Sequence, residues 1–587
     1  MLLENLVTRR VSEENASKSS LTRRVTKQGH LLLAARRLRK CLVPNETQLS
    51  ATLYRSFISR IQLTRLMKTT YAFVVIILCV AITYAPLVTG TFAFGDDFLL
   101  FFSEEDLSYA YLADGRPLFG LAQAVFHAPV QTLEQLRWFR GATAAGVAGM
   151  MILLWTSCNR LFSDRTWTTC VLVAAATLPC LHTYVAQANF WLCPIAGCLA
   201  IIAAQRMALT QSPGFGSGIV AISLMLVVGA IYQPMLSWYW VVIGLGWLGV
   251  LTAESSHTGC DNRTQLSAES RQLWRAMIVG FAAYLACFLA MKAYFIIFGA
   301  TAKPRTLLAT NPIDKLYWLL RIQVPQSLNF WHLIVLESRV VPLGIAALVG
   351  SVIAGGWFIR FRSGSQIWFK IFIGFSITAT LTHSHWLLIA DNPQSYRVIA
   401  PMGTLAWIVF AWGIAQWLSL KPSLVTSVTA GTRGWRAAIP IAIAAMAMMI
   451  CQQQALRYWI LPHETSYRFL MFEIRDRILP SSRKIHLVRE RRSDGLVYPS
   501  VIESFGCPAT ERDWMVESMV RQALRQTGHS SQIESITHDV SSIDGAREAA
   551  TQPIDTLVID MRRLVLFRDR VDSSLILTKF QSSGEIE

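Results

Sequence analysis

Two neighbouring aspartates, Asp96 and Asp97, follow directly after the first long apolar segment, in the sequence "TFAFGDDFLLFF". Adjacent carboxylates repel each other, and nearby apolar surface raises the pKa of a carboxyl group. One of the two can therefore act as a base, or both can hold a divalent cation. The same pair is also compatible with a solvated loop, and the pattern alone leaves both interpretations open.

Two arginines lie at the ends of other apolar segments. Arg397 follows Tyr396 in "SYRVIAPMG", where a late apolar segment begins, and Arg116 follows Asp114 in "DGRPL". A guanidinium in such a position can bind a lipid headgroup or the phosphate of a ligand. The alternatives are a snorkelling anchor for Arg397 and a turn with a local ion pair for Asp114 and Arg116.

Four further polar residues fall in or beside apolar segments: Gln233, Lys292, His383 and His385. A charge near the hydrocarbon region costs roughly 3 kcal/mol or more, so residues of this kind are functional candidates by default. We expect Lys292 to snorkel outward or to pair with an acid of an outer loop. His383 and His385 point to different sides of a helix, which disfavours a shared metal site.

The elements that must position these residues are membrane-spanning helices. Hydrophobic residues make up 53% of the 587 residues and charged residues only 16%, which is far from the composition of a soluble protein. Of the net charge of +17, residues 1–66 carry +9, and the other basic residues cluster between apolar segments. This distribution indicates membrane topology and a lipid bilayer as the surroundings, not a nucleic-acid partner.

The sequence predicts an all-α polytopic membrane protein with about 11 transmembrane helices, because each span needs about 20 apolar residues. The predicted spans lie near 70–90, 141–161, 168–187, 190–208, 217–234, 235–252, 276–298, 340–360, 367–389, 398–419 and 437–455. Arginines and lysines gather in the even-numbered connections, which places the N-terminus in the cytoplasm.

Three regions follow from this pattern. Residues 1–66 form a basic cytoplasmic tail, and the stretch from Met67 looks like a natural start, so we expect the tail to be dispensable or an overcalled start. Residues 67–455 form the transmembrane region, with outer loops at 91–140 and 299–339. Residues 456–587 contain short β-like runs ("KIHLV", "TLVIDM", "RLVLF") and an amphipathic stretch near 511–526, which predict a small extracytoplasmic α/β domain.

In order and placement, four short motifs resemble those of the bacterial O-antigen glucosyltransferases, the serotype-converting enzymes with a GT-C fold. The motifs are Asp96-Asp97, "DGRPL" at 114–118, "YQ" at 232–233 and "SYR" at 395–397, and the resemblance covers about 67–480. It implies a multi-pass protein of the bacterial inner membrane. It also implies transfer of a monosaccharide, glucose in this family, from a polyprenyl-phosphate donor to a glycan such as O-antigen on the outer face of that membrane.

Within this resemblance, Asp96 or Asp97 supplies the base, and Arg397, helped by Arg116, holds the departing phosphate. Asp114, Gln233, Lys292 and Tyr396 are the other candidates for the substrate cavity. The sequence leaves open whether Asp96 and Asp97 bind a divalent cation and which sugar is transferred. A flippase or polysaccharide transporter is the alternative, although no repeated halves and no midplane path of charges are evident. A non-catalytic scaffold is a third reading.

Overall fold

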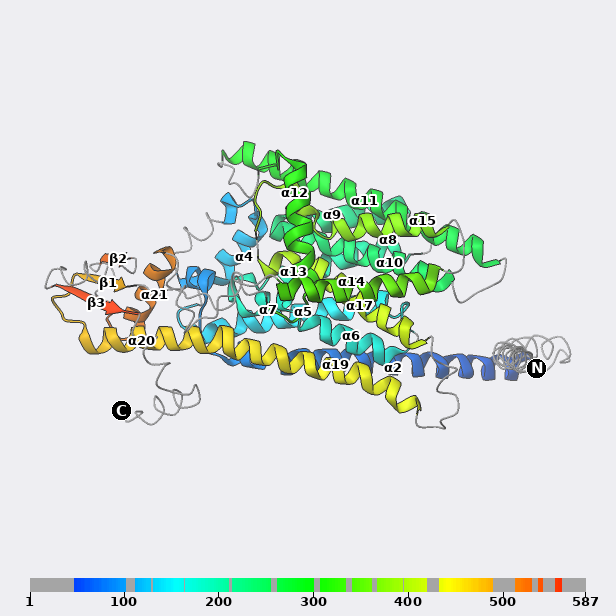
Figure 1. Cartoon of the computed structure of the whole chain (residues 1–587), viewed down its shortest axis with the longest axis horizontal. Coiled ribbons are helices and arrows are strands. Elements are labelled where there is room, and N and C mark those ends of the chain that lie inside the picture. Colours follow the sequence, from blue (N-terminus) through cyan, green and yellow to red (C-terminus); the bar gives the residue numbers. More distant parts are fainter. Residues whose placement is uncertain are drawn as a thin grey trace. The chain divides into compact units, whose positions relative to one another are not determined.

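A computed structural model describes most of the helical part of the chain and parts of its C-terminal region (Figure 1). The described residues are 47–101, 111–127, 130–162, 164–210, 214–254, 261–299, 307–333, 340–361, 367–393, 395–419, 432–488, 513–529, 537–541 and 555–561. The chain divides into two compact units, residues 1–71 and 72–587. The candidate site described in the next subsection lies in the second unit.

The protein is mostly helical, as the sequence predicts. Its longer helices are α2 (Thr47–Thr89), α4 (Pro117–His127), α5 (Leu136–Cys158), α6 (Arg165–Ala176), α7 (Pro179–Ala186), α8 (Cys193–Ala208), α9 (Phe215–Tyr232), α10 (Trp238–Glu254), α11 (Asp261–Phe298), α14 (Val340–Phe361), α15 (Ile367–Leu381), α17 (Ala400–Ser419), α19 (Thr432–Gln454), α20 (Leu461–Arg477) and α21 (Asp513–Gln526).

Short helical turns lie between them. They are η1 (Gly95–Phe101), η2 (Leu133–Gln135), η3 (Ala188–Phe190), η4 (Gln233–Ser237), α12 (Pro312–Trp318), η6 (Leu319–Gln323), α13 (Val324–Leu328), α16 (Ser384–Leu388), η7 (Tyr396–Ile399) and η8 (Ala455–Ile460). Helix α2 already runs through 47–66, which belongs to the stretch predicted as a basic tail.

Within the described ranges, eight helical stretches are long and apolar enough to cross a membrane, and nine if the pair α6 and α7, bent by 55°, is one span. The sequence predicted about 11. The two predicted spans at 217–234 and 235–252 become one apolar stretch, Phe215–Ala253, because η4 joins α9 to α10. The predicted span at 367–389 is divided at Thr382 and His383 into α15 and the short α16.

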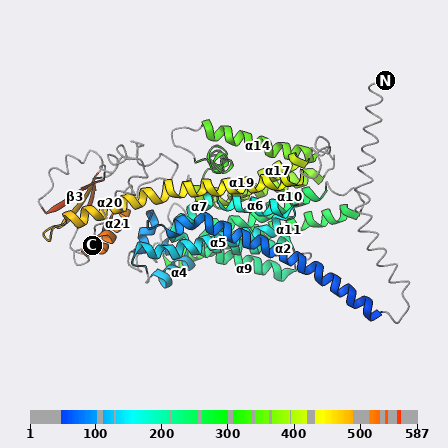
Figure 2. The same cartoon turned by 90° about the horizontal axis from the view of Figure 1, so that it is seen from below.

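Helix α10 lies in the centre of the bundle, against α8, α11, α15 and α17. Figure 2 shows it near α11 and α17 from a second direction. Its Trp238, Trp240 and Trp247 are fully buried. Glycines allow the close approach: a Cβ on Gly374 would lie 2.5 Å from the Trp247 side chain. Small residues at such contacts let membrane helices pack closely.

The C-terminal region contains a parallel three-stranded sheet in the order β2-β1-β3 (Figure 1). Its strands are β1 (Lys484–Val488), β2 (Thr537–Ser541) and β3 (Thr556–Asp560). Strands are present at the predicted runs "KIHLV" and "TLVIDM", and α21 occupies the predicted amphipathic stretch, whereas "RLVLF" lies outside the described residues. No break occurs near residue 456: α19, η8 and α20 follow one another directly. Helix α21 packs against α20 and η1.

Candidate functional site

Asp97 lies in η1 and forms a fully buried ion pair with Arg140. Its Oδ2 is 3.2 Å from Arg140 Nη2, and neither side chain is exposed. The backbone N–H groups of Phe94 and Asn189 also donate to the carboxylate, at 3.3 Å to Oδ2 and 3.1 Å to Oδ1. Burial raises the pKa of Asp97 to about 6, although Arg140 and the two N–H groups act to lower it.

Arg140 connects three parts of the chain. It donates from Nη1 to the carbonyl oxygen of Gly90 at 3.1 Å, from Nη2 to that of Phe92, and from Nε to that of Ala186 at 3.2 Å. Its guanidinium also lies 3.7 Å from the centroid of the Phe92 ring. The sequence analysis placed this residue in the outer loop, but it lies in the first turns of α5 and points into the protein.

Asp96 is also part of η1, but its side chain lies outside the described residues. Its assignment as a base or a cation ligand therefore stays a prediction. Among the residues that the structure describes, no group of three or more His, Cys, Asp or Glu side chains is placed to hold a metal ion. Both oxygens of Asp97 already accept hydrogen bonds, two at Oδ2 and one at Oδ1.

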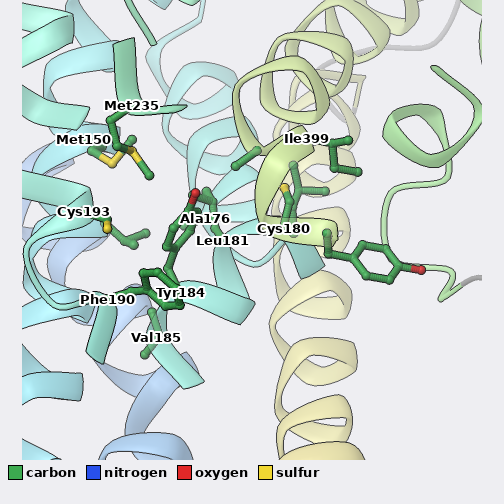
Figure 3. Packing of buried hydrophobic residues seen from close by; sticks show 14 of the residues in the cluster. Met150, Ala176, Cys180, Leu181, Tyr184, Val185, Phe190, Cys193, Met235 and Ile399 are labelled. Carbon is green, nitrogen blue, oxygen red and sulfur yellow. The ribbon is translucent and has the colours of Figure 1, made fainter. Parts of the chain in front are cut away.

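Arg397 lies in η7 and is held by the segment between α7 and α8. Its Nη1 donates to Gln187 Oε1 at 3.1 Å, and its guanidinium lies 4.7 Å from the centroid of the Phe190 ring. The Tyr184 hydroxyl donates to the Arg397 carbonyl oxygen at 3.1 Å. The neighbouring Tyr396 is buried. Figure 3 shows Tyr184 and Phe190 next to each other in the packed interior.

Asp97 and Arg397 therefore contact the same short segment. Its Ala186 carbonyl and Asn189 N–H bind the Asp97–Arg140 pair, while Gln187 and Phe190 bind Arg397. The resemblance assigns Asp96 or Asp97 and Arg397 to one site. In the structure Asp97 and Arg397 contact the same segment, but the Asp97 carboxylate faces Arg140.

Arg116 lies at the turn between Tyr111 and α4. Its guanidinium is 3.7 Å from Asp114 Oδ2 and 4.7 Å from the centroid of the Tyr232 ring. Gly115 adopts a φ of +71°, which glycine tolerates best, and its carbonyl accepts a 2.6 Å hydrogen bond from Gln233 Nε2. The local ion pair that the sequence allowed as an alternative is present.

An aromatic pair joins the two arginines. The rings of Phe190 and Tyr232 have centroids 5.8 Å apart, and each carries one guanidinium, from Arg397 and Arg116 respectively. Two residues 281 positions apart thus flank a single aromatic pair near the ends of several helices.

A cavity of about 130 Å³ lies beside Arg116, between α9, α11 and α16. Its polar lining is the Gly115 backbone and the side chains of Gln233, Tyr284, Tyr294 and His385, and the remainder is largely apolar. Lys292 lies close by, with its Nζ 5.6 Å from the centroid of the Phe288 ring, which also lines the cavity.

His383 and His385 occupy different surroundings. His385 lines the cavity, whereas His383 is buried against Trp318 with ring centroids 5.3 Å apart. The two imidazoles therefore point to different surroundings. Their spacing in the sequence predicted this separation. His385 is a cavity residue that the sequence analysis had weighed only as a metal ligand.

This arrangement suits an amphipathic anion. The cavity offers apolar surface for a hydrocarbon chain, and the aromatic pair next to it carries two guanidinium groups, which bind phosphate with charge-assisted hydrogen bonds. Comparisons of the chain with models of known protein families and with curated proteins give no match.

Proposed function

We propose that this protein is a membrane glycosyltransferase that moves a monosaccharide, glucose in the first instance, from a polyprenyl-phosphate donor to a cell-surface glycan such as O-antigen. The observation that carries the proposal is the placement of Arg116 and Arg397 on the two rings of the Phe190–Tyr232 pair, beside an apolar cavity. The resemblance of the four sequence motifs supports it as well.

The chemistry of a lipid-linked donor explains why such a cavity is needed. A long prenyl chain stays in the bilayer, so the enzyme must receive the phosphate at membrane depth or at its interface. An apolar cavity takes the first part of the chain, and the guanidinium groups bind the phosphate at its end. Two arginines provide planar pairs of donors for phosphate oxygens, which a lysine does not.

The proposed reaction is a single displacement at the anomeric carbon. The acceptor hydroxyl oxygen forms the new bond to this carbon, and the bond to the phosphate oxygen breaks, with its electron pair leaving on the polyprenyl phosphate. A carboxylate takes the hydroxyl proton. The transition state has oxocarbenium character, as in glycoside hydrolysis, and the configuration inverts.

Asp96 is the favoured base in this scheme. Asp97 was an equal candidate by sequence, but its carboxylate is buried and bound to Arg140, so it supports the site more readily than it takes a proton from an acceptor. A divalent cation at Asp96 and Asp97 stays part of the proposal as an option, because carboxylate oxygens are suitable ligands.

The proposed setting is the bacterial inner membrane, with the N-terminus in the cytoplasm and the site and the C-terminal α/β region on the periplasmic side. The alternation of basic connections supports this topology. A periplasmic site also suits the acceptor, since a surface glycan is completed outside the cytoplasm.

The test is transfer by the purified protein in detergent or nanodiscs. Polyprenyl-phosphate glucose and lipopolysaccharide are incubated with the wild type, Asp96→Asn and Arg397→Ala, with Arg206→Ala as the matched control on an exposed arginine of α8. We expect glucose transfer by the wild type and the control, and its loss in the other two variants. Full transfer by Asp96→Asn and Arg397→Ala would refute the assigned roles. Donor flipping in sealed vesicles without transfer would favour the transporter instead.

A further inference from the structure

We propose that Arg140 is a positioning residue: with Asp97 as its counter-ion, it fixes the segment 186–190 so that Gln187 and Phe190 hold Arg397 in place. The inference rests on the proposed function of Arg397 as a phosphate ligand. It assigns to Arg140 a role at the site that the sequence motifs do not contain.

The hydrogen bonds of Arg140 show why this residue type is needed. All three nitrogens of its guanidinium are used, toward the carbonyl oxygens of Gly90, Phe92 and Ala186 and toward Asp97. These acceptors come from the end of the first span, from the turn before η1 and from the end of α7. A planar group with five N–H donors can bridge them together, whereas the single ammonium of a lysine cannot reach all of them.

The link to Arg397 is short. The Ala186 carbonyl is bound by Arg140, and the Asn189 N–H is bound by Asp97, so the pair holds the segment on both sides of Gln187. Gln187 accepts from Arg397, and Phe190 follows Asn189 directly. A shift of this segment therefore moves both contacts of the Arg397 guanidinium. Misplacement by about 1 Å at a reacting site can cost about a hundredfold in rate.

Stability alone does not account for such a pair. Removing two charges from water is costly, and apolar residues of similar volume often stabilise a protein as well as a buried ion pair does. The raised pKa of Asp97 agrees with this, because it reflects the cost of burying the charged form. Orientation of the segment is the role that the contacts support.

Kinetics give the first test. We expect Arg140→Lys to raise the donor KM at least tenfold with little effect on the acceptor KM, while Arg206→Lys, on an exposed arginine, leaves both unchanged. Introduced into Arg397→Lys, the Arg140→Lys change should add little, because residues that act through one another are not additive. An unchanged donor KM, or effects that multiply fully, would overturn the inference.

Hydrogen–deuterium exchange gives a test that does not depend on transfer. We expect faster exchange of peptides covering 184–192 in Arg140→Lys than in the wild type or Arg206→Lys, with exchange in α17 unchanged. The double variant Asp97→Asn with Arg140→Gln leaves no unpaired buried charge, so it should fold even if a single variant does not. Its peptides covering 184–192 should still exchange faster than those of the wild type. Unchanged exchange there would contradict the positioning role even if transfer is confirmed. Absence of transfer by the wild type, with the exchange result as expected, would refute only the proposed function.

Discussion

Arg140 and Arg397 contact the same five-residue segment but in different ways. Arg140 is fully buried and is surrounded by a carboxylate and three carbonyl oxygens. Arg397 is partly exposed and binds a neutral amide oxygen and the face of an aromatic ring. The first charge is neutralised inside the protein and suits a structural role. The second is oriented by Gln187 and Phe190 and stays partly exposed, which suits a group that receives an anion.

The largest effect is expected from removing Arg140 outright. In Arg140→Leu the buried Asp97 carboxylate loses its counter-ion, and breaking a buried pair in this way costs about 3–5 kcal/mol. We predict a strongly lowered unfolding temperature for this variant and little change for Arg397→Ala, measured by thermal unfolding in the same detergent. Equal stability of the two variants would remove the distinction between the two arginines.

The second-largest effect is expected from placing a carboxylate beside Arg397, as Asp97 lies beside Arg140. In Gln187→Glu the guanidinium gains an anionic partner that competes with the donor phosphate. We predict about a tenfold weaker donor binding, equivalent to about 1.4 kcal/mol, and a smaller loss for Gln187→Ala. Titration with polyprenyl phosphate measures both. Tighter binding by Gln187→Glu would argue against a phosphate at Arg397.

The pH dependence distinguishes stability from activity. Because the pKa of Asp97 is raised from 3.8 to about 6, the folded protein binds this proton more tightly than the unfolded chain does. The contribution of Asp97 to stability is therefore fully present below about pH 4 and lost as the pH rises through about 6. The Asp97–Arg140 ion pair forms as the Asp97 carboxyl loses its proton near pH 6. Because this pair positions the segment that holds Arg397, the transfer rate should rise with pH over this range.

Transfer rates between pH 5 and 8 check this expectation. Asp97→Asn should lack the inflection near pH 6. His463 lies near this site, with its ring centroid 4.8 Å from that of Phe94, so His463→Gln serves as the control for that group and should keep the inflection. A profile that is identical in Asp97→Asn and the wild type would assign the titration to another residue.

The smallest effect is expected at the aromatic pair. Phe190→Leu keeps apolar volume but removes the ring face under Arg397, a contact of about 0.5–1 kcal/mol at a partly exposed site. We predict a two- to fivefold weaker donor binding, with Phe126→Leu as the control on an exposed phenylalanine of α4. An unchanged affinity would show that Gln187 alone orients the guanidinium.

The sequence predicted the mostly helical fold with membrane-spanning helices, because this follows from the length and spacing of the apolar segments. The assignment of Asp97 and Arg397 to one site stays a prediction. Arg140 was missed for a physical reason. The second span was expected to begin at residue 141, but η2 leads directly into α5 at Leu136, which places Arg140 on an inward-facing helical turn. Apolar periodicity does not define a helix start to within one turn, so it does not separate a loop charge from a buried one.

Other differences also come from long-range packing. The strand β2, "THDVS", has only a weak alternating pattern and exists through its parallel pairing with β1. The position of Gln233 in the cavity depends on its bond to the Gly115 carbonyl, 118 residues away. The separation of His383 from His385, in contrast, followed directly from their spacing.

The most direct test of the central claim is donor-phosphate binding by Arg397→Lys, compared with Arg206→Lys. The lysine keeps the positive charge and any anchoring to the interface but loses the planar pair of donors. We predict at least a tenfold rise in the dissociation constant for polyprenyl phosphate in Arg397→Lys and none in Arg206→Lys. Equal affinity of Arg397→Lys and the wild type would contradict the account, because Arg397 would then act only as a charged anchor.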